Sequence, residues 1–163
     1  MSEEAAAEAA GCLFIQDSTV LAAYNPKYNI WSGVGGKIQD NESIKEAAYR
    51  ETIEELFGLT PSAAIIEECI QTFDFKQPQL RNNYAFIQLS LDAFIHIIYI
   101  LKAYNYKSPY YIHLPTTVSE LVQRRKMGPG QEITDLKLVD YRSPSADISK
   151  DLLDDCIYYE NNK

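Results

Sequence analysis

The sequence predicts an α+β fold in which a mixed β-sheet packs around one central helix. Short apolar runs rich in β-formers lie both before and after residues 43–57, a segment that contains neither glycine nor proline. Strands on both sides of a helix favour a mixed sheet over a doubly wound parallel one. The length of 163 residues suits a single domain, so we expect residues 1–163 to form one unit with a flexible tail at residues 1–10.

The first predicted element is a β-hairpin. Residues 11–15 and 20–24 are compact apolar runs, and the polar residues 16–19 between them read as the turn. Three glycines then crowd into four positions, which indicates a backbone that bends tightly or is closely approached. They are Gly33, Gly35 and Gly36.

The predicted central helix covers residues 43–57. Ser43 followed three residues later by Glu46 is a capping-box pattern, which marks a helix start. Gly58 stands where a glycine commonly ends a helix.

The remaining elements follow from residue preferences and spacing. Segments rich in Ile, Phe, Tyr and Thr predict strands at residues 64–75, 84–91 and 94–104. We further expect a short helix at residues 118–127, broken by Gly128, Pro129 and Gly130, a strand at residues 132–139, and a C-terminal helix at residues 148–158.

Charge and composition exclude several classes of function. A net charge of -8 and a pI near 4.7 argue against a long nucleic-acid partner, and the basic run at residues 124–126 is expected to be a solvated turn. The longest apolar stretch, residues 94–101, is too short for a membrane span. Three scattered cysteines and an acidic, alanine-rich start without a basic leader indicate reduced thiols and a cytoplasmic location.

The chemically informative residues are three glutamates on the predicted helix. Glu51, Glu54 and Glu55 are spaced i, i+3 and i+4, so their carboxylates share one helix face. Clustered carboxylate oxygens suit Mg²⁺ or Mn²⁺, which can bridge carboxylates to substrate phosphates. Just upstream, Gly35 and Gly36 offer backbone groups and Lys37 a positive charge for phosphate oxygens.

The spacing of these residues resembles the Nudix box. Gly36, five residues, Glu42, seven residues, then Arg50, Glu51, two residues, Glu54 and Glu55 match it at every charged position. The resemblance to Nudix hydrolases is strong over residues 31–59, and the approach to the box looks like that of MutT-type nucleoside triphosphate pyrophosphohydrolases. It implies a Nudix-like α/β/α sandwich that carries the box as a loop, a helix and a loop.

Three departures from the family pattern are visible. The box expects a bulky aliphatic residue where this chain has Thr52, and one residue before the closing glycine where it has Leu56 and Phe57. In enzymes that act on oxidised purines, an asparagine that contacts the base stands at the position of Ser32. The extra residue follows Glu55, so it need not disturb the glutamate face.

The resemblance implies a role for each matching residue. Glu51, Glu54 and Arg50 would be catalytic, one of the glutamates or a residue outside the box deprotonating water and Arg50 orienting the glutamates. Mg²⁺ or Mn²⁺ would be bound by Gly36, Glu51, Glu54, Glu55 and a further carboxylate, for which Glu132 is the first candidate and Glu120 the second. Substrate contacts would come from Ser32, Gly35, Lys37 and Trp31, with aromatic stacking available from Tyr28, Trp31, Phe73, Phe75 and Tyr84.

The implied activity is hydrolysis of a diphosphate linkage in a small nucleotide substrate. The leading substrate is a nucleoside triphosphate with a modified purine, cleaved to monophosphate and pyrophosphate. Alternatives that use the same cleft are mRNA caps, dinucleoside polyphosphates, sugar nucleotides and diphosphoinositol polyphosphates. A catalytically silent, nucleotide-binding Nudix domain is the alternative from another class, which the intact glutamates oppose. A homodimer is compatible with the sequence.

Overall fold

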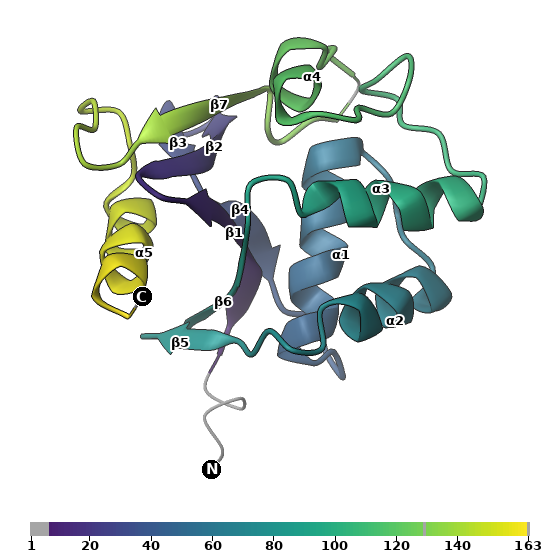
Figure 1. Ribbon diagram of the computed structural model, residues 1–163, viewed down its shortest axis with the longest axis horizontal. Coiled ribbons are helices and arrows are strands. Elements are labelled where there is room, and N and C mark those ends of the chain that lie inside the picture. Colours follow the sequence, from purple (N-terminus) through teal and green to yellow (C-terminus); the bar gives the residue numbers. More distant parts are fainter. Residues whose placement is uncertain (1–6, 129, 163) are drawn as a thin grey trace.

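The computed structural model describes residues 7–128 and 130–162, and it has the predicted α+β architecture with a mixed sheet. Figure 1 shows the strands between two helical layers, with α1, α2 and α3 on one side and α5 on the other. Two separate clusters of buried apolar residues correspond to these layers, one against α1–α3 and one against α5.

Strand β1 organises the sheet. It pairs parallel with β6 and antiparallel with β4 along its first half, and its end forms a hairpin with β2. Strand β2 continues the sheet to β3 and β7, and β6 continues it to β5. The strands are β1 (Ala9–Gln16), β2 (Thr19–Asn25), β3 (Ile30–Ser32), β4 (Val34–Lys37), β5 (Gln79–Arg81), β6 (Tyr84–Leu89) and β7 (Asp135–Asp140).

Both faces of β1 are buried, which explains its continuous apolar sequence. Cys12 and Phe14 belong to the cluster on the α1 side, whereas Leu13 and Ile15 belong to the cluster on the α5 side. The strand starts earlier than predicted. The prediction of a tail to residue 10 is therefore wrong for Ala9 and Ala10, and residues 1–6 lie outside the described part of the chain.

Helix α1 (Ile44–Phe57) confirms the prediction of a capped central helix. Ser43 and Glu46 form both reciprocal hydrogen bonds of a capping box, at 3.1 Å each. Gly58 ends the helix with a left-handed φ of 67°, a conformation that favours glycine. Thr52, the departure from the aliphatic box position, is fully buried, and its hydroxyl donates to the Ala48 carbonyl at 2.7 Å.

Two of the predicted strands are helices. Residues 64–75 correspond to α2 (Ala63–Thr72) and residues 94–104 to α3 (Phe94–Ala103), whereas residues 84–91 do contain a strand, β6. In α3 the buried side chains recur at i, i+3, i+4 and i+7, the spacing of a helix face. Burial of that face overrides the β-preference of its isoleucines.

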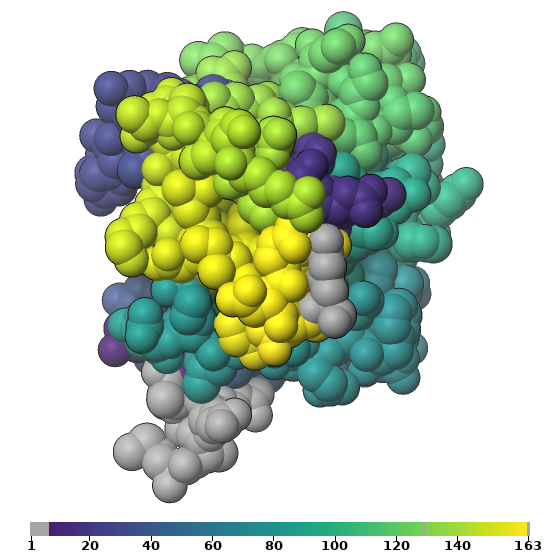
Figure 2. All heavy atoms as spheres, turned by 60° about the vertical axis from the view of Figure 1, so that its left-hand side comes forward, coloured from purple at the N-terminus to yellow at the C-terminus, as the bar shows by residue number. Residues whose placement is uncertain are grey.

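The C-terminal elements follow the predicted order with shifted ends. They are α4 (Val118–Gln123), β7 and α5 (Lys150–Asn161). Figure 2 shows α5 in yellow at the front of the molecule, adjoining the teal segment that includes β5. None of the helices formed by the described residues has the length and apolarity that spanning a membrane requires.

Candidate metal and substrate site

An acidic cavity of about 230 Å³ lies at the C-terminal half of α1. Glu51, Glu54 and Glu55 line it from α1, and Glu132 lines it from the segment that precedes β7. Tyr110, Arg125, Gly130 and Ile133 complete the lining. The structure thus brings together four carboxylates that the sequence analysis selected as metal ligands.

Arg50 fixes the box at its centre. Its Nη1 atom donates to Glu51 at 2.9 Å and to Glu54 at 3.1 Å. Its Nε and Nη2 atoms donate to both carboxylate oxygens of Glu42, at 2.7 and 3.0 Å, and Nη2 also reaches the Lys37 carbonyl at 3.0 Å. The guanidinium therefore couples the loop before α1 to the glutamate face, which agrees with the orienting role expected for Arg50.

The donor set of the acidic cavity fits a divalent cation. Within the described residues, no group of His, Cys, Asp and Glu side chains is already arranged to hold a metal ion. However, Glu55 Oε2 is buried with no hydrogen-bond partner among the described residues. Burial, and then repulsion by Glu51 and Glu132, raises the pKa of Glu55 well above its ordinary value. The four carboxylates outnumber the two arginines beside them, Arg50 and Arg125, and hard oxygen ligands suit Mg²⁺ or Mn²⁺.

Gly36 leaves the room that the Glu51 carboxylate occupies. A Cβ atom at residue 36 would lie 2.4 Å from Glu51 Cδ and 2.5 Å from its Oε2 atom. Gly35 contributes a backbone hydrogen bond to Glu55. Both glycines belong to β4, so this strand approaches the glutamates without intervening side chains.

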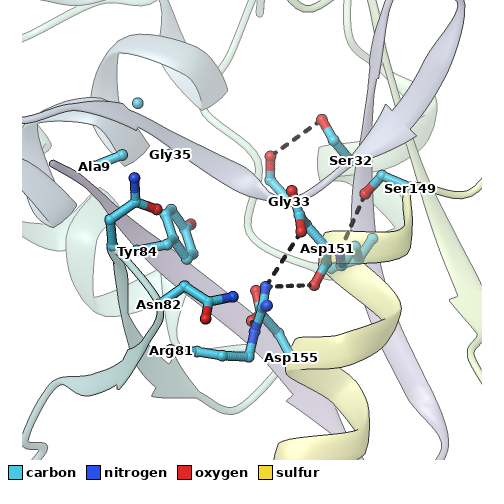
Figure 3. Close-up of a pocket in the computed structure, with 13 residues that line it drawn as sticks. Ala9, Ser32, Gly33, Gly35, Arg81, Asn82, Tyr84, Ser149, Asp151 and Asp155 are labelled. Atoms are coloured by element: carbon cyan, nitrogen blue, oxygen red, sulfur yellow. Dashed lines mark hydrogen bonds and ion pairs between the residues drawn. The ribbon is translucent and has the colours of Figure 1, made fainter. Parts of the chain in front are cut away.

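A second, larger cavity of about 410 Å³ adjoins β4 (Figure 3). Ser32, Gly33, Gly35 and Gly36 line it from β3, β4 and their connection. Its other walls are the β5–β6 turn and the start of α5, with Arg81, Asn82, Asn83, Tyr84, Ser149, Asp151, Leu152 and Asp155. Gly36 thus borders this cavity and also contacts Glu51 of the acidic cavity.

Arg81 joins the two far walls of the larger cavity. Its Nε atom donates to Asp155 Oδ1 at 2.7 Å, and its Nη2 atom donates to the Asp151 carbonyl at 3.2 Å, the links drawn between β5 and α5 in Figure 3. Asp155 is one of two buried polar residues of the described chain. Burial raises the pKa of Asp155 to about 6, although the Arg81 guanidinium opposes this shift.

Several predicted site residues lie outside both cavities. Trp31 packs against Tyr24, with ring centroids 5.1 Å apart, and the Lys137 ammonium lies 4.2 Å from its ring. Lys37 lines neither cavity, and Glu120 lies in the first turn of α4, where its carboxylate accepts from the backbone N–H of Thr116 at 2.8 Å. Of the five aromatic candidates for stacking, Tyr84 alone is among the residues that line the larger cavity.

Sequence reasoning missed several residues of these cavities, among them Arg81, Asp155 and Arg125. Arg81 and Asp155 lie 74 positions apart, and no local pattern pairs them. Arg125 was expected in a solvated turn, which is wrong, because its guanidinium binds three backbone carbonyls, whereas Arg124 is 71% exposed. A long-range pairing of this kind has no counterpart in sequence spacing.

A mixed α+β domain that gathers carboxylates from a central helix beside a larger ligand-sized cavity has the layout of a hydrolase. Residues 6–142 match the family model of the NUDIX domain, and the chain belongs to this family. As a Nudix hydrolase it is a pyrophosphohydrolase, and its family acts on nucleoside-diphosphate-linked compounds with divalent metal ions.

Solved structures that resemble the chain come from the same family. They include a NUDIX hydrolase from Clostridium perfringens (12% identity, TM-score 0.43, covering 93% of this chain and 94% of that one). A MutT NUDIX hydrolase from Burkholderia pseudomallei shows 14% identity and a TM-score of 0.39, covering 88% and 90%. An ADP-ribose pyrophosphatase from Streptococcus suis shows 11% identity and a TM-score of 0.43, covering 93% and 90%. No curated protein matches the chain.

Proposed function

We propose that this Nudix hydrolase cleaves a nucleoside triphosphate, with a modified purine as the leading base, to the monophosphate and pyrophosphate. One observation carries the proposal. Gly36 lines the larger cavity and lies against the Glu51 carboxylate, which lines the acidic cavity, so we infer that a single ligand could place its phosphates against the glutamates and its nucleoside in the 410 Å³ space. That volume falls in the range of small-ligand pockets.

In this proposal Glu51, Glu54, Glu55, Glu132 and the Gly36 carbonyl hold Mg²⁺ or Mn²⁺. A cation held there would supply polarisation of the phosphoryl group and neutralisation of charge on the leaving phosphate. Glu54 is our candidate to accept the proton of the attacking water, because its side chain is 35% exposed and that of Glu51 only 15%. Arg50 keeps both carboxylates oriented by donating to each of them.

A sugar nucleotide is the second candidate substrate. The larger cavity offers amides from Asn82 and Asn83 and a hydroxyl from Ser149, groups that pair with sugar hydroxyls. Tyr84 is the one aromatic side chain in its lining. A purine would normally gain more from further aromatic surface.

The deciding experiment is a product assay on purified protein with Mg²⁺ or Mn²⁺. Nucleoside triphosphates, including oxidised purines, are compared with sugar nucleotides, dinucleoside polyphosphates, caps and diphosphoinositol polyphosphates. We expect release of pyrophosphate and monophosphate from a triphosphate, and a loss of at least about 10²-fold in kcat for Glu54→Gln. The control Glu67→Gln changes an exposed glutamate on α2. Activity that persists in chelator and in Glu54→Gln would contradict the proposal.

We also propose a cytoplasmic location for the enzyme. Cys12, Cys69 and Cys156 are all buried free thiols. Such thiols suit a reducing compartment. Fractionation of the cells that produce the protein tests this, and recovery in an oxidising compartment would contradict it.

A further inference from the structure

The segment between α4 and β7 carries Glu132 to the box, and Arg125 fastens this segment to α1. The Nη1 atom of Arg125 donates to the Leu56 carbonyl at 2.7 Å, and its Nη2 atom donates to the Glu55 carbonyl at 2.8 Å. The same Nη2 atom donates to the carbonyl of Ile133 at 3.1 Å. One guanidinium therefore bridges the residue next to Glu132 and the end of the helix that bears the other glutamates.

The position of this bridge on α1 is specific. The last carbonyls of a helix have no partner within it, and a planar guanidinium can satisfy several of them at once. The guanidinium also lies 4.6 Å from the Tyr110 ring, which packs over Gly58 and Gly128. The backbone N–H of Lys126 donates to the Tyr110 carbonyl at 2.8 Å, so the start of the segment is held as well.

Glu132 itself has no such anchor in the described structure. It is exposed, and it reaches the acidic cavity from a stretch without helix or strand. The bonds of its neighbour Gln131 go to Gly128 and Lys126 within the same segment, whereas the bond from Arg125 to Ile133 links the residue after Glu132 to the guanidinium that also binds the end of α1. The distance between Glu132 and the box glutamates therefore depends on Arg125.

We propose that Arg125 is a positioning residue, which sets Glu132 against Glu51 and Glu55 and so completes the metal site. This inference rests on the metal site of the proposed function. For removal of Arg125, a positioning role and the loss of its charge predict opposite changes in metal affinity. A cation that lines the cavity repels a bound metal ion, so removal of Arg125 should tighten metal binding if charge alone mattered. Positioning predicts weaker binding.

The test measures Mn²⁺ binding to substrate-free protein by electron paramagnetic resonance. Arg125→Ala is compared with Glu132→Gln, with the double variant and with Arg125→Lys. The lysine keeps the positive charge but lacks the planar guanidinium that binds several carbonyls at once. Loss of a residue that orients a metal ligand typically weakens metal affinity about 10-fold to 100-fold. We expect the dissociation constant to rise at least about 10-fold in each single variant, and no further in the double variant. Arg125→Lys should recover only part of the loss.

The controls separate folding, metal binding and positioning. Arg124→Ala removes the neighbouring cation, which is 71% exposed and pairs with Glu120 at 3.5 Å, and should leave Mn²⁺ binding unchanged. Thermal unfolding in chelator shows which variants are folded. If Arg125→Ala is unfolded, the comparison is made with Arg125→Lys. Unchanged or tighter binding in the folded Arg125 variants overturns the inference, as do independent, multiplying losses in the double variant. Unchanged binding in Glu55→Gln would instead contradict the metal site itself.

Discussion

Replacing Gly36 by alanine probes the contact between β4 and the box. The new Cβ would lie 2.4 Å from Glu51 Cδ and 2.6 Å from its Oε1 atom. Carbon atoms that are not bonded rest about 3.5 Å apart, so the carboxylate must move by roughly 1 Å. That movement breaks the 2.9 Å bond from Arg50 Nη1 to Glu51.

A shift of this size should cost far more activity than stability. Misplacing a reacting group by about 1 Å can lower the rate about 10²-fold, which corresponds to about 2.7 kcal/mol in the activation free energy. The free energy of unfolding should change by less than about 1 kcal/mol, because the atoms displaced are the end of a side chain that can rotate away.

The assay compares kcat/KM, Mn²⁺ affinity and urea unfolding for the wild-type protein and Gly36→Ala. Gly33→Ala is the matched control for metal affinity and unfolding, since its Cβ would meet only Leu152 Cδ1 at 3.6 Å. A Gly36→Ala enzyme with unaltered kcat/KM would refute the idea that Glu51 must stand where it does.

Three further predictions concern charged residues. Arg50→Ala should lower the free energy of unfolding in urea by about 3 kcal/mol or more, because it leaves Glu42 and the box glutamates without the cation that they share. A loss below about 1 kcal/mol would contradict this prediction. Glu55→Gln should raise the melting temperature in chelator, because it removes a buried ionisable carboxyl group. It should also abolish the stabilisation that we expect Mn²⁺ to give the wild-type protein, and a variant still stabilised by Mn²⁺ would count against this prediction. Burial raises the pKa of Asp155 from 3.8 to about 6, so the folded protein binds this proton more tightly than the unfolded chain does. The free energy of unfolding should therefore fall by about 2 kcal/mol between pH 4 and pH 6 on account of this group. Urea unfolding of Asp155→Asn should lack that decline, and parallel pH curves for the two proteins would exclude it.

The parts of the fold that sequence predicted well are those whose signals are local. The Ser43 and Glu46 cap, the Gly58 stop and the glutamate spacing each depend on neighbours within a few positions, and the structure shows α1 with both caps in place. The chain order of the hairpin, β6 and the C-terminal helix followed for the same reason.

The errors arose where tertiary burial decides the conformation. The isoleucines of α2 and α3 favour strands in isolation, but burial of one helical face against α1 and its neighbours stabilises helices. The spacing of Phe94, Ile97, Ile98 and Leu101 carried the helical signal, which residue preference alone concealed.

The same difference between local and long-range signals separates the site residues that sequence predicted from those that it missed. The glutamates of α1 lie on one face as their spacing predicts, and the structure brings Glu132 to the same cavity. Trp31 was selected through the resemblance to the family, yet alternation along a strand directs neighbours to opposite faces. Arg81 pairs with Asp155 across 74 positions, and Arg125 binds the Leu56 carbonyl across 69, partners that only the folded chain reveals.

The family match ends at residue 142, but α5, which supplies one wall of the larger cavity, begins at Lys150. The glutamates of the acidic cavity and the α5 wall of the larger cavity, against which the nucleoside would lie in the proposed function, therefore belong to separate stretches of the chain. Under the proposed function, changes in α5 would alter which substrate binds and leave the glutamates of α1 unchanged. Under that proposal, substitutions confined to this short C-terminal segment would be enough to change the substrate selectivity of the enzyme.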